Sequence, residues 1–109
     1  MIVAKFKKKR ANFVSLAISG HAGCGELGSD LVCASVSSAL QMLVNGLIEV
    51  LKLNCVVNTE DNLVLLEISK GNEEPQLSAG YAFMQAFCLH LRLLSKEYEK
   101  AVSVIISEV

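Results

Sequence analysis

The feature that most restricts how this chain can fold is a long stripe of aliphatic residues in its middle. Within about residues 30–52, aliphatic side chains recur at spacings of three and four: Val36, Leu40, Leu43, Leu47 and Leu51. This spacing predicts a helix with one apolar face, which another layer of structure must cover. A second stripe of the same period predicts a helix over about residues 76–97: Leu77, Tyr81, Met84, Cys88, Leu91 and Leu94.

The segments around the two helices alternate apolar and polar residues, as strands do. Strands are expected at residues 2–8, 13–19, 54–59, 63–69 and 101–106. In the second of these, Val14, Leu16 and Ile18 are expected to face the core. The order ββαββαβ predicts an α+β fold, a two-layer sandwich in which one mainly antiparallel sheet carries two helices on one face. A length of 109 residues fits a single domain, residues 1–109.

Charge and composition exclude several classes of protein. The formal net charge of −1 gives no footprint for nucleic acid, and the basic run Lys7-Lys8-Lys9-Arg10 is interpreted as a solvated turn. No secretion signal is recognised, and no apolar stretch is judged to reach the roughly 18 residues of a membrane span. We therefore expect a cytoplasmic protein without membrane contact, whose four cysteines are thiols.

A glycine-rich segment separates the second strand from the first helix. It contains four glycines, which make a regular element costly and predict a mobile loop: Gly20, Gly23, Gly25 and Gly28. Ser29 is expected to precede the helix as its N-terminal capping residue, and Asp30 suits the positive end of the helix.

Two residues that flank this loop can carry chemistry. His21 follows the second strand, and Cys33 is expected in the first turn of the helix, where partial positive charge favours thiolate over thiol. An imidazole nearby could take the thiol proton, and free N–H groups could stabilise an oxyanion. Asp30, three residues before Cys33, could orient His21 or bind a basic substrate. Ser37, four residues after Cys33, could hydrogen-bond near the sulfur.

Structural interpretations compete with this chemistry. Taken singly, Cys33 could be a core residue, His21 a hydrogen-bonded residue at a strand end, Asp30 a helix-end charge and Ser37 a satisfied helix hydroxyl. Cys55, in a predicted strand, and Cys88, on the apolar stripe of the second helix, are interpreted as core residues. His90 lies on a different helical face from Cys88 and is interpreted as solvated.

A zinc site is a second candidate function. His21, Cys24 and Cys33 could supply three ligands, but their spacing is not a usual structural pattern and a fourth ligand is missing. A non-catalytic ribosome-assembly or interaction module is a third, because a fold alone does not fix a function.

The motif residues around His21 and Cys33 indicate a protein family more specifically together than any of them does alone. The tripeptide Gly20-His21-Ala22, the glycine-rich loop, and Asp30-x-x-Cys33-x-x-x-Ser37 at the helix start resemble the signature of the ribosomal-processing cysteine proteases. The similar length and order of elements extend the resemblance over nearly the whole chain. Cys24, within the loop, has no assigned place in this pattern.

The resemblance implies a function and a site. Such enzymes remove a short N-terminal extension, ending in a hydrophobic and aromatic sequence, from the precursor of bacterial ribosomal large-subunit protein twenty-seven. They are homodimers, and no cofactor or metal is expected. Their catalytic pair maps onto Cys33 and His21, with Asp30, Ser37 and Gly20 in support. The remaining motif residues would form a loop that substrate orders: Ala22, Gly23, Gly25, Gly28 and Ser29.

Overall fold

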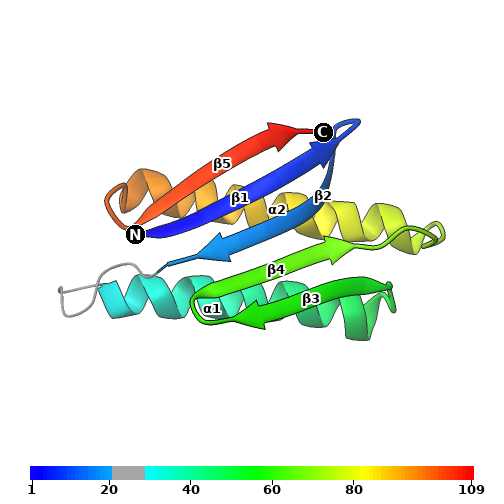
Figure 1. Cartoon of the computed structure of the whole chain (residues 1–109), viewed down its shortest axis with the longest axis horizontal. Helices are drawn as coiled ribbons and strands as arrows, with labels where there is room; N and C mark the ends of the chain where they lie inside the picture. The colour runs from blue at the N-terminus through cyan, green and yellow to red at the C-terminus, as the bar shows by residue number, and fades with distance from the viewer. Residues whose placement is uncertain (21–28) are drawn as a thin grey trace.

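The chain folds as one sheet covered on one face by two helices (Figure 1). The computed structural model describes residues 1–20 and 29–109, with residues 29 and 30 described by their backbone alone. The elements in chain order are β1 (Ile2–Lys9), β2 (Asn12–Ser19), α1 (Ser29–Asn45), a π-helical turn η1 (Gly46–Val50), β3 (Cys55–Glu60), β4 (Leu63–Ile68), α2 (Gln76–Glu97) and β5 (Val102–Glu108). The predicted order ββαββαβ and the α+β fold class are confirmed.

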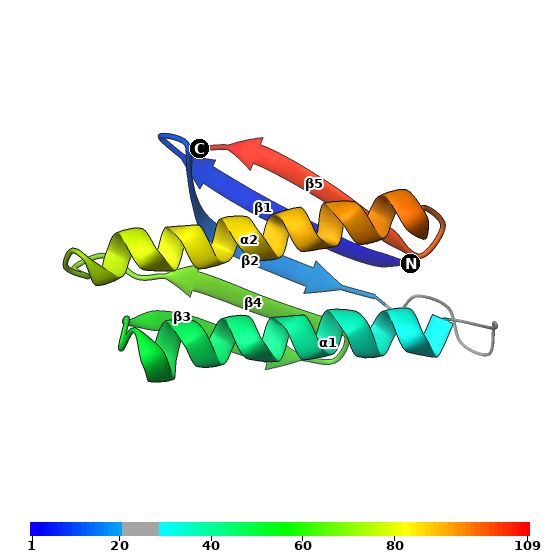
Figure 2. The same ribbon diagram turned by 180° about the vertical axis from the view of Figure 1, so that it is seen from behind.

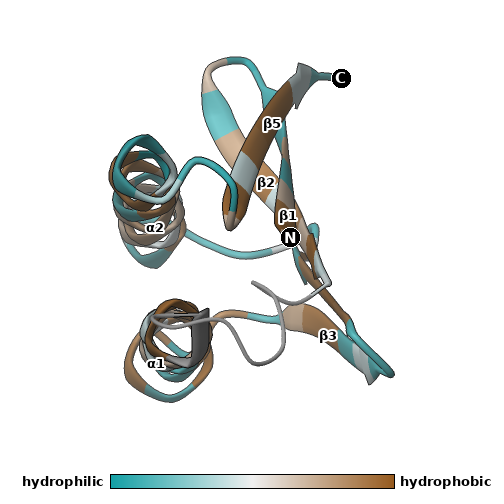
Figure 3. Ribbon diagram, turned by 90° about the vertical axis from the view of Figure 1, so that its left-hand side faces the viewer, coloured by the Kyte–Doolittle hydropathy of each residue, from teal (hydrophilic) through white to brown (hydrophobic). Residues whose placement is uncertain are grey.

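The five strands lie in the order β3-β4-β2-β1-β5. The pairs β1–β2, β2–β4 and β3–β4 are antiparallel, and β5 joins the edge of β1 in parallel. Both helices lie on the same side of this sheet, as Figure 2 shows from behind and Figure 3 shows end-on. The helices thus form an outer layer whose second face is turned away from the sheet.

The inward-facing residues of β2 differ from those predicted. Lys7 pairs with Ser15 but Lys8 pairs with Phe13, so the register shifts at Val14. Because the extra residue reverses the alternation, Phe13 is buried beside Leu16 and Ile18 while Val14 is only half-buried. The expectation that Val14 faces the core was wrong, since a strict period of two holds only while the register is continuous.

The core between the two layers is mainly aliphatic. Phe6 of β1 is fully buried and packs its ring against Phe13, with ring centroids 5.7 Å apart, and against Phe87 of α2 at 6.2 Å. From the predicted stripes, Val36, Leu43 and Leu47 of the first helical segment are buried. The predicted stripe of α2 is buried at its centre, at Met84, Cys88 and Leu91.

The first helix ends differently from the prediction of a continuous helix over 30–52. Regular α-helix stops at Asn45, and Gly46–Val50 form a wider turn that the Leu51 N–H closes on the Gly46 carbonyl at 2.9 Å. Gly46 lies so close to α2 that a Cβ at this position would stand 2.9 Å from the Phe83 ring. Lys52, with a φ of 57°, then leads the chain out of the helix.

The first helical segment is also more apolar than expected. Leu31–Val50 comprises 20 residues with a mean hydropathy of 1.7, so by length and composition it could span a membrane. The expectation that no stretch reaches this length was wrong. One such helix is a weak sign, because core helices of soluble proteins meet the same test, and here Val36, Leu43 and Leu47 are buried in the core.

One side chain joins the two connections at the far end of the sheet. The Asn72 side-chain oxygen accepts a hydrogen bond from the Asn54 N–H at 2.8 Å. Its amide nitrogen donates to the Asn54 carbonyl at 2.9 Å and to the Ser69 carbonyl at 2.8 Å. Three such bonds hold the start of β3 against the segment that enters α2.

Candidate active site

The end of β2 is fixed by its neighbours just before His21. Gly20 has a φ of 86°, and its N–H donates to the Asn62 carbonyl in the β3–β4 turn at 3.0 Å. A Cβ at residue 20 would stand 2.2 Å from the Met1 carbonyl oxygen. Only glycine satisfies both the positive φ and the close approach. These contacts fix the backbone of Gly20, the residue that precedes His21 in the sequence.

Cys33 lies on α1 with its side chain half-buried and packed against the edge of the core. Because α1 begins at Ser29, Cys33 is in the second turn of the helix and not in the first as predicted. The first four N–H groups of a helix lack partners within it, so the N–H of Cys33 itself is used in the helix. An oxyanion at this helix end would instead meet N–H groups that precede Cys33.

The other helix residues of the motif fall where their spacing places them. Ser37 is exposed one turn beyond Cys33, on the same side of α1. Asp30 is in the first turn of α1, and its side chain lies outside the described part of the structure, as does that of Ser29. Ser29 is the first helical residue rather than the residue before the helix, which corrects its predicted position.

Several predicted site residues lie outside the described residues. They are His21, Ala22, Gly23, Cys24, Gly25 and Gly28. The base role of His21 and the substrate-ordered loop therefore stay predictions. The zinc alternative also depends on His21 and Cys24. Among the side chains that the structure describes, no three of His, Cys, Asp or Glu gather as metal ligands would.

Comparison with known proteins identifies the family. The family model described as cysteine protease Prp matches residues 1–103. The ribosomal processing cysteine protease Prp of Staphylococcus aureus is 30% identical over 88 residues, which cover 78% of each chain. The chain belongs to the Prp family of cysteine proteases. It is therefore an enzyme of the cysteine protease class, and the family resemblance inferred from the motif is confirmed.

Solved structures of similar fold span nearly the whole Prp-family chain. SMU.848 from Streptococcus mutans has a TM-score of 0.82 at 26% identity and covers 100% of this chain and 96% of its own. The S. aureus Prp complex with a covalently linked product peptide has a TM-score of 0.82 at 22% identity, covering 97% and 99%. These likenesses agree with the two-layer fold described above.

The two remaining described cysteines of this Prp-family chain lie in the core or against it. Cys88 is buried in the core, where burial raises the pKa of its thiol while the charges of Arg92 and Lys8 lower it by less. Burial likewise raises the pKa of the Cys55 thiol in β3. Both shifts disfavour thiolate, as expected of core residues.

Asn62 was not predicted to lie beside the site. This residue occupies the left-handed region, with a φ of 60°, in the turn that accepts the Gly20 N–H. The Asp61-Asn62 pair is a typical turn signal, but only the tertiary structure shows that this turn lies against the residue before His21.

Proposed function

We propose that the chain removes the N-terminal extension from the precursor of ribosomal large-subunit protein twenty-seven, with Cys33 as nucleophile and His21 as base. One observation supports this proposal most strongly. The chain belongs to the Prp family and also contains the motifs Gly20-His21-Ala22 and Asp30-x-x-Cys33-x-x-x-Ser37. The S. aureus relative is named a ribosomal processing protease. A related solved structure is described as a complex with a substrate peptide.

The proposed chemistry proceeds in two steps. The sulfur of Cys33 attacks the carbonyl carbon of the scissile peptide bond while His21 holds the thiol proton. The C–N bond breaks, His21 gives that proton to the leaving amine, and the extension remains as a thioester on Cys33. Water then attacks the thioester with His21 as base, which releases the extension as a carboxylic acid and restores the thiol.

The positions of the motif residues support this division of roles. Cys33 is half-buried, so its sulfur stands at the boundary between core and solvent. Gly20 is held by the β3–β4 turn and leads directly into His21. Asp30 precedes Cys33 by about one helical turn and would orient His21 or bind a basic part of the substrate, and exposed Ser37 would act near the sulfur.

We further propose that the enzyme works in the cytoplasm as a homodimer. A cytoplasmic location suits a chain that keeps its cysteines as thiols, and no disulfide joins Cys33, Cys55 and Cys88. A ribosomal protein precursor would be met in the same compartment.

The substrate is tested by incubating the precursor with the enzyme and measuring intact masses of both products. A matched control precursor would carry polar residues in place of the aromatic residues at the end of its extension. The proposal predicts a single cut in the natural precursor and at least about 100-fold slower cleavage of the control. An uncut natural precursor would refute the substrate assignment while leaving the protease class intact.

His21 is tested separately. His21→Ala should bind the precursor but turn over at least about 100-fold more slowly, the lower range for loss of a general base. The wild-type pH–rate profile should rise along a limb that is absent from the variant. Full activity of His21→Ala would refute the base assignment.

A further inference from the structure

The strand β3 forms one edge of the sheet, and its backbone is open on that side. It stands at the end of the strand order and, among the described strands, pairs with β4 alone. An edge strand offers its N–H and C=O groups to any extended chain that can reach them, and proteins often protect such edges with Lys or Pro. The sequence of β3, Cys-Val-Val-Asn-Thr-Glu, contains neither. This edge can therefore accept a further strand.

The alternation of hydrogen bonds along β3 identifies the backbone groups that point to the free edge. Just before the strand, the Asn54 carbonyl accepts the Ser69 N–H at 3.0 Å, so these two residues form a hydrogen-bonded pair. Bonded and non-bonded pairs alternate along an antiparallel ladder. In the continuous register of β3 and β4, the residues that bond to β4 are therefore Val56, Asn58 and Glu60. The residues whose N–H and C=O groups point outward are Cys55, Val57 and Thr59.

The side chain of Val57 lies on the face of the sheet that the helices cover. Val57 pairs directly with Leu66, which is buried in the core, so the two side chains share that face. Val57 nevertheless is 37% exposed. Its neighbour Val56 is 48% exposed and points to the opposite, uncovered face. At Val57, an exposed apolar side chain and outward-pointing backbone groups thus occur together.

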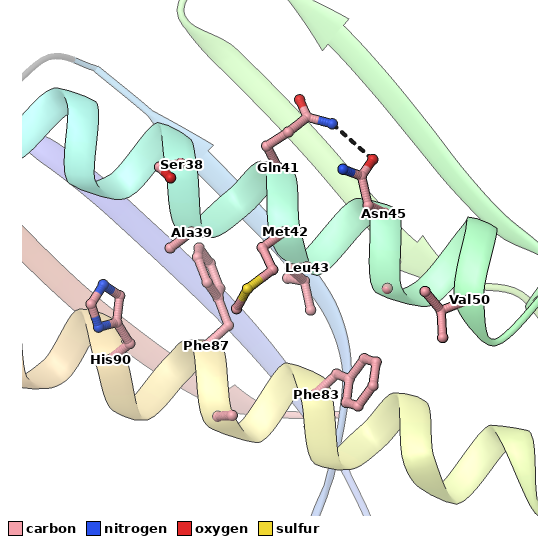
Figure 4. A pocket seen from close by; sticks show the side chains of 12 residues that line it. Ser38, Ala39, Gln41, Met42, Leu43, Asn45, Val50, Phe83, Phe87 and His90 are labelled. Carbon is pink, nitrogen blue, oxygen red and sulfur yellow. Dashed lines mark hydrogen bonds between the residues drawn. The ribbon is translucent and has the colours of Figure 1, made fainter.

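A stripe of α1 that begins at Cys33 lies on the β3 side of this helix. Leu40 and Val44 follow Cys33 by seven and eleven residues, which places both within about 20° of its direction at about 100° per residue. All three are packed against the core and partly buried. Met42, nine residues after Cys33, projects from the opposite side into the space between α1 and α2 (Figure 4). Because α1 lies over the half of the sheet that contains β3 and β4 (Figure 2), the Cys33 stripe faces the margin formed by β3.

The stripe and the strand edge lead to the same end of the molecule. β3 ends at the turn whose Asn62 carbonyl accepts the Gly20 N–H, and α1 begins at that end (Figure 1). The eleven residues from Cys33 to Val44 span about 16 Å of helix, the length of about five residues of extended chain at about 3.3 Å each. The other edge strand, β5, lies at the opposite margin of the sheet, away from α1.

We propose that the hydrophobic end of the precursor's extension binds as an added strand along the free edge of β3, with alternate side chains directed toward Val57, Leu40 and Val44. The inference rests on the proposed function and adds the place where that substrate binds. In the proposed chemistry the extension stays on Cys33 as a thioester, so its last residues must lie beside this stripe. Main-chain hydrogen bonds to β3 would supply affinity, and the apolar side chains would select for hydrophobic residues.

The side-chain contact is tested by steady-state cleavage of the precursor by Val57→Asp. A charge on the apolar path should raise KM at least about 10-fold and change kcat less than about 3-fold, because it weakens ground-state and transition-state binding alike. Val56→Asp is the matched control. It makes the same change in the adjacent residue, whose side chain points to the other face, and should leave KM within about 3-fold of the wild type. Both side chains are exposed, so both variants should fold, which circular dichroism checks.

The backbone contact is tested by hydrogen exchange in Cys33→Ala, with and without uncut precursor. The N–H groups of Val57 and Thr59 should exchange at least about 10-fold more slowly in the complex, whereas those of Val56 and Asn58, already bonded to β4, should change less than about 3-fold. This measurement leaves β3 unsubstituted.

Two sets of results separate this inference from the proposed function. If the wild type cuts the precursor, then an unchanged KM in Val57→Asp or unchanged exchange at Val57 and Thr59 would overturn the β3 docking site and leave the substrate assignment in place. A precursor that the wild type does not cut and that Cys33→Ala does not bind would refute both.

Discussion

Gly20→Ala is the substitution that best tests how the fold holds the active site. The new Cβ would meet the Met1 carbonyl oxygen at 2.2 Å, and the backbone φ of 86° disfavours any residue with a Cβ. The left-handed conformation costs about 1–2 kcal/mol, which a stiffer unfolded chain offsets by about 0.4–1 kcal/mol. Forcing an atom into an occupied site adds about 1–3 kcal/mol. The free energy of unfolding should therefore fall by about 1–5 kcal/mol.

Gly71→Ala separates the two contributions. Gly71 has nearly the same φ, 89°, but an added Cβ there would have no atom within 4 Å. The free energy of unfolding of Gly71→Ala, measured in urea, should fall by about 1 kcal/mol or less, because only the backbone conformation contributes. Because Gly20 precedes His21, Gly20→Ala should also lower kcat/KM for the precursor about 100-fold, as expected for a misplaced catalytic group, while Gly71→Ala should change it less than about 2-fold.

Equal stability losses in the two variants would refute the close approach of Met1 to Gly20. An unchanged kcat/KM in a folded Gly20→Ala enzyme would refute the idea that Gly20 positions the residue after it. Assays should be run at a temperature where both variants remain folded, so that loss of activity does not report unfolding.

Three further predictions concern the rest of the fold. Met84→Ala should lower the free energy of unfolding by about 2–5 kcal/mol, measured in urea, because Met84 is fully buried and its loss leaves a cavity; a loss below about 1 kcal/mol would contradict the packing. Asn72→Ala should cost about 0.5–1.5 kcal/mol because the exposed backbone groups of Asn54 exchange their side-chain partner for water, and an unchanged midpoint would contradict this. Burial raises the pKa of Cys88, so the unfolded chain releases this proton at lower pH and stability should fall as pH rises above about 8.5. Cys88→Ala should flatten that decline between about pH 8 and 10, and an identical slope in both proteins would contradict the shift.

Much of the fold could be predicted because local pattern and tertiary packing agree. The stripes at three- and four-residue spacing fixed both helices, and Gln76–Glu97 matches the predicted range. The errors came from long-range effects. The register shift at Val14 depends on pairing with β1, and the wide turn at Gly46 occurs where this glycine lies against Phe83 of α2.

The motif of the candidate site is visible in the sequence, whereas the surroundings of that motif depend on the tertiary structure. The order of His21, Asp30, Cys33 and Ser37 is seen in the sequence alone, and the spacing of the last three places them along one helix. The role of Asn62 could not be predicted from local pattern, because its carbonyl accepts the Gly20 N–H across 42 positions of sequence (62 minus 20).

The central claim, that Cys33 is the nucleophile, is tested most directly by single-turnover cleavage of the precursor by Cys33→Ala, with Cys55→Ala as the matched cysteine control. Intact masses would follow the precursor and its two products over time. We predict that Cys33→Ala folds normally and cleaves at least about 1,000-fold more slowly, whereas Cys55→Ala cleaves within about 3-fold of the wild-type rate. Cleavage by Cys33→Ala at a rate near that of the wild type would contradict the account.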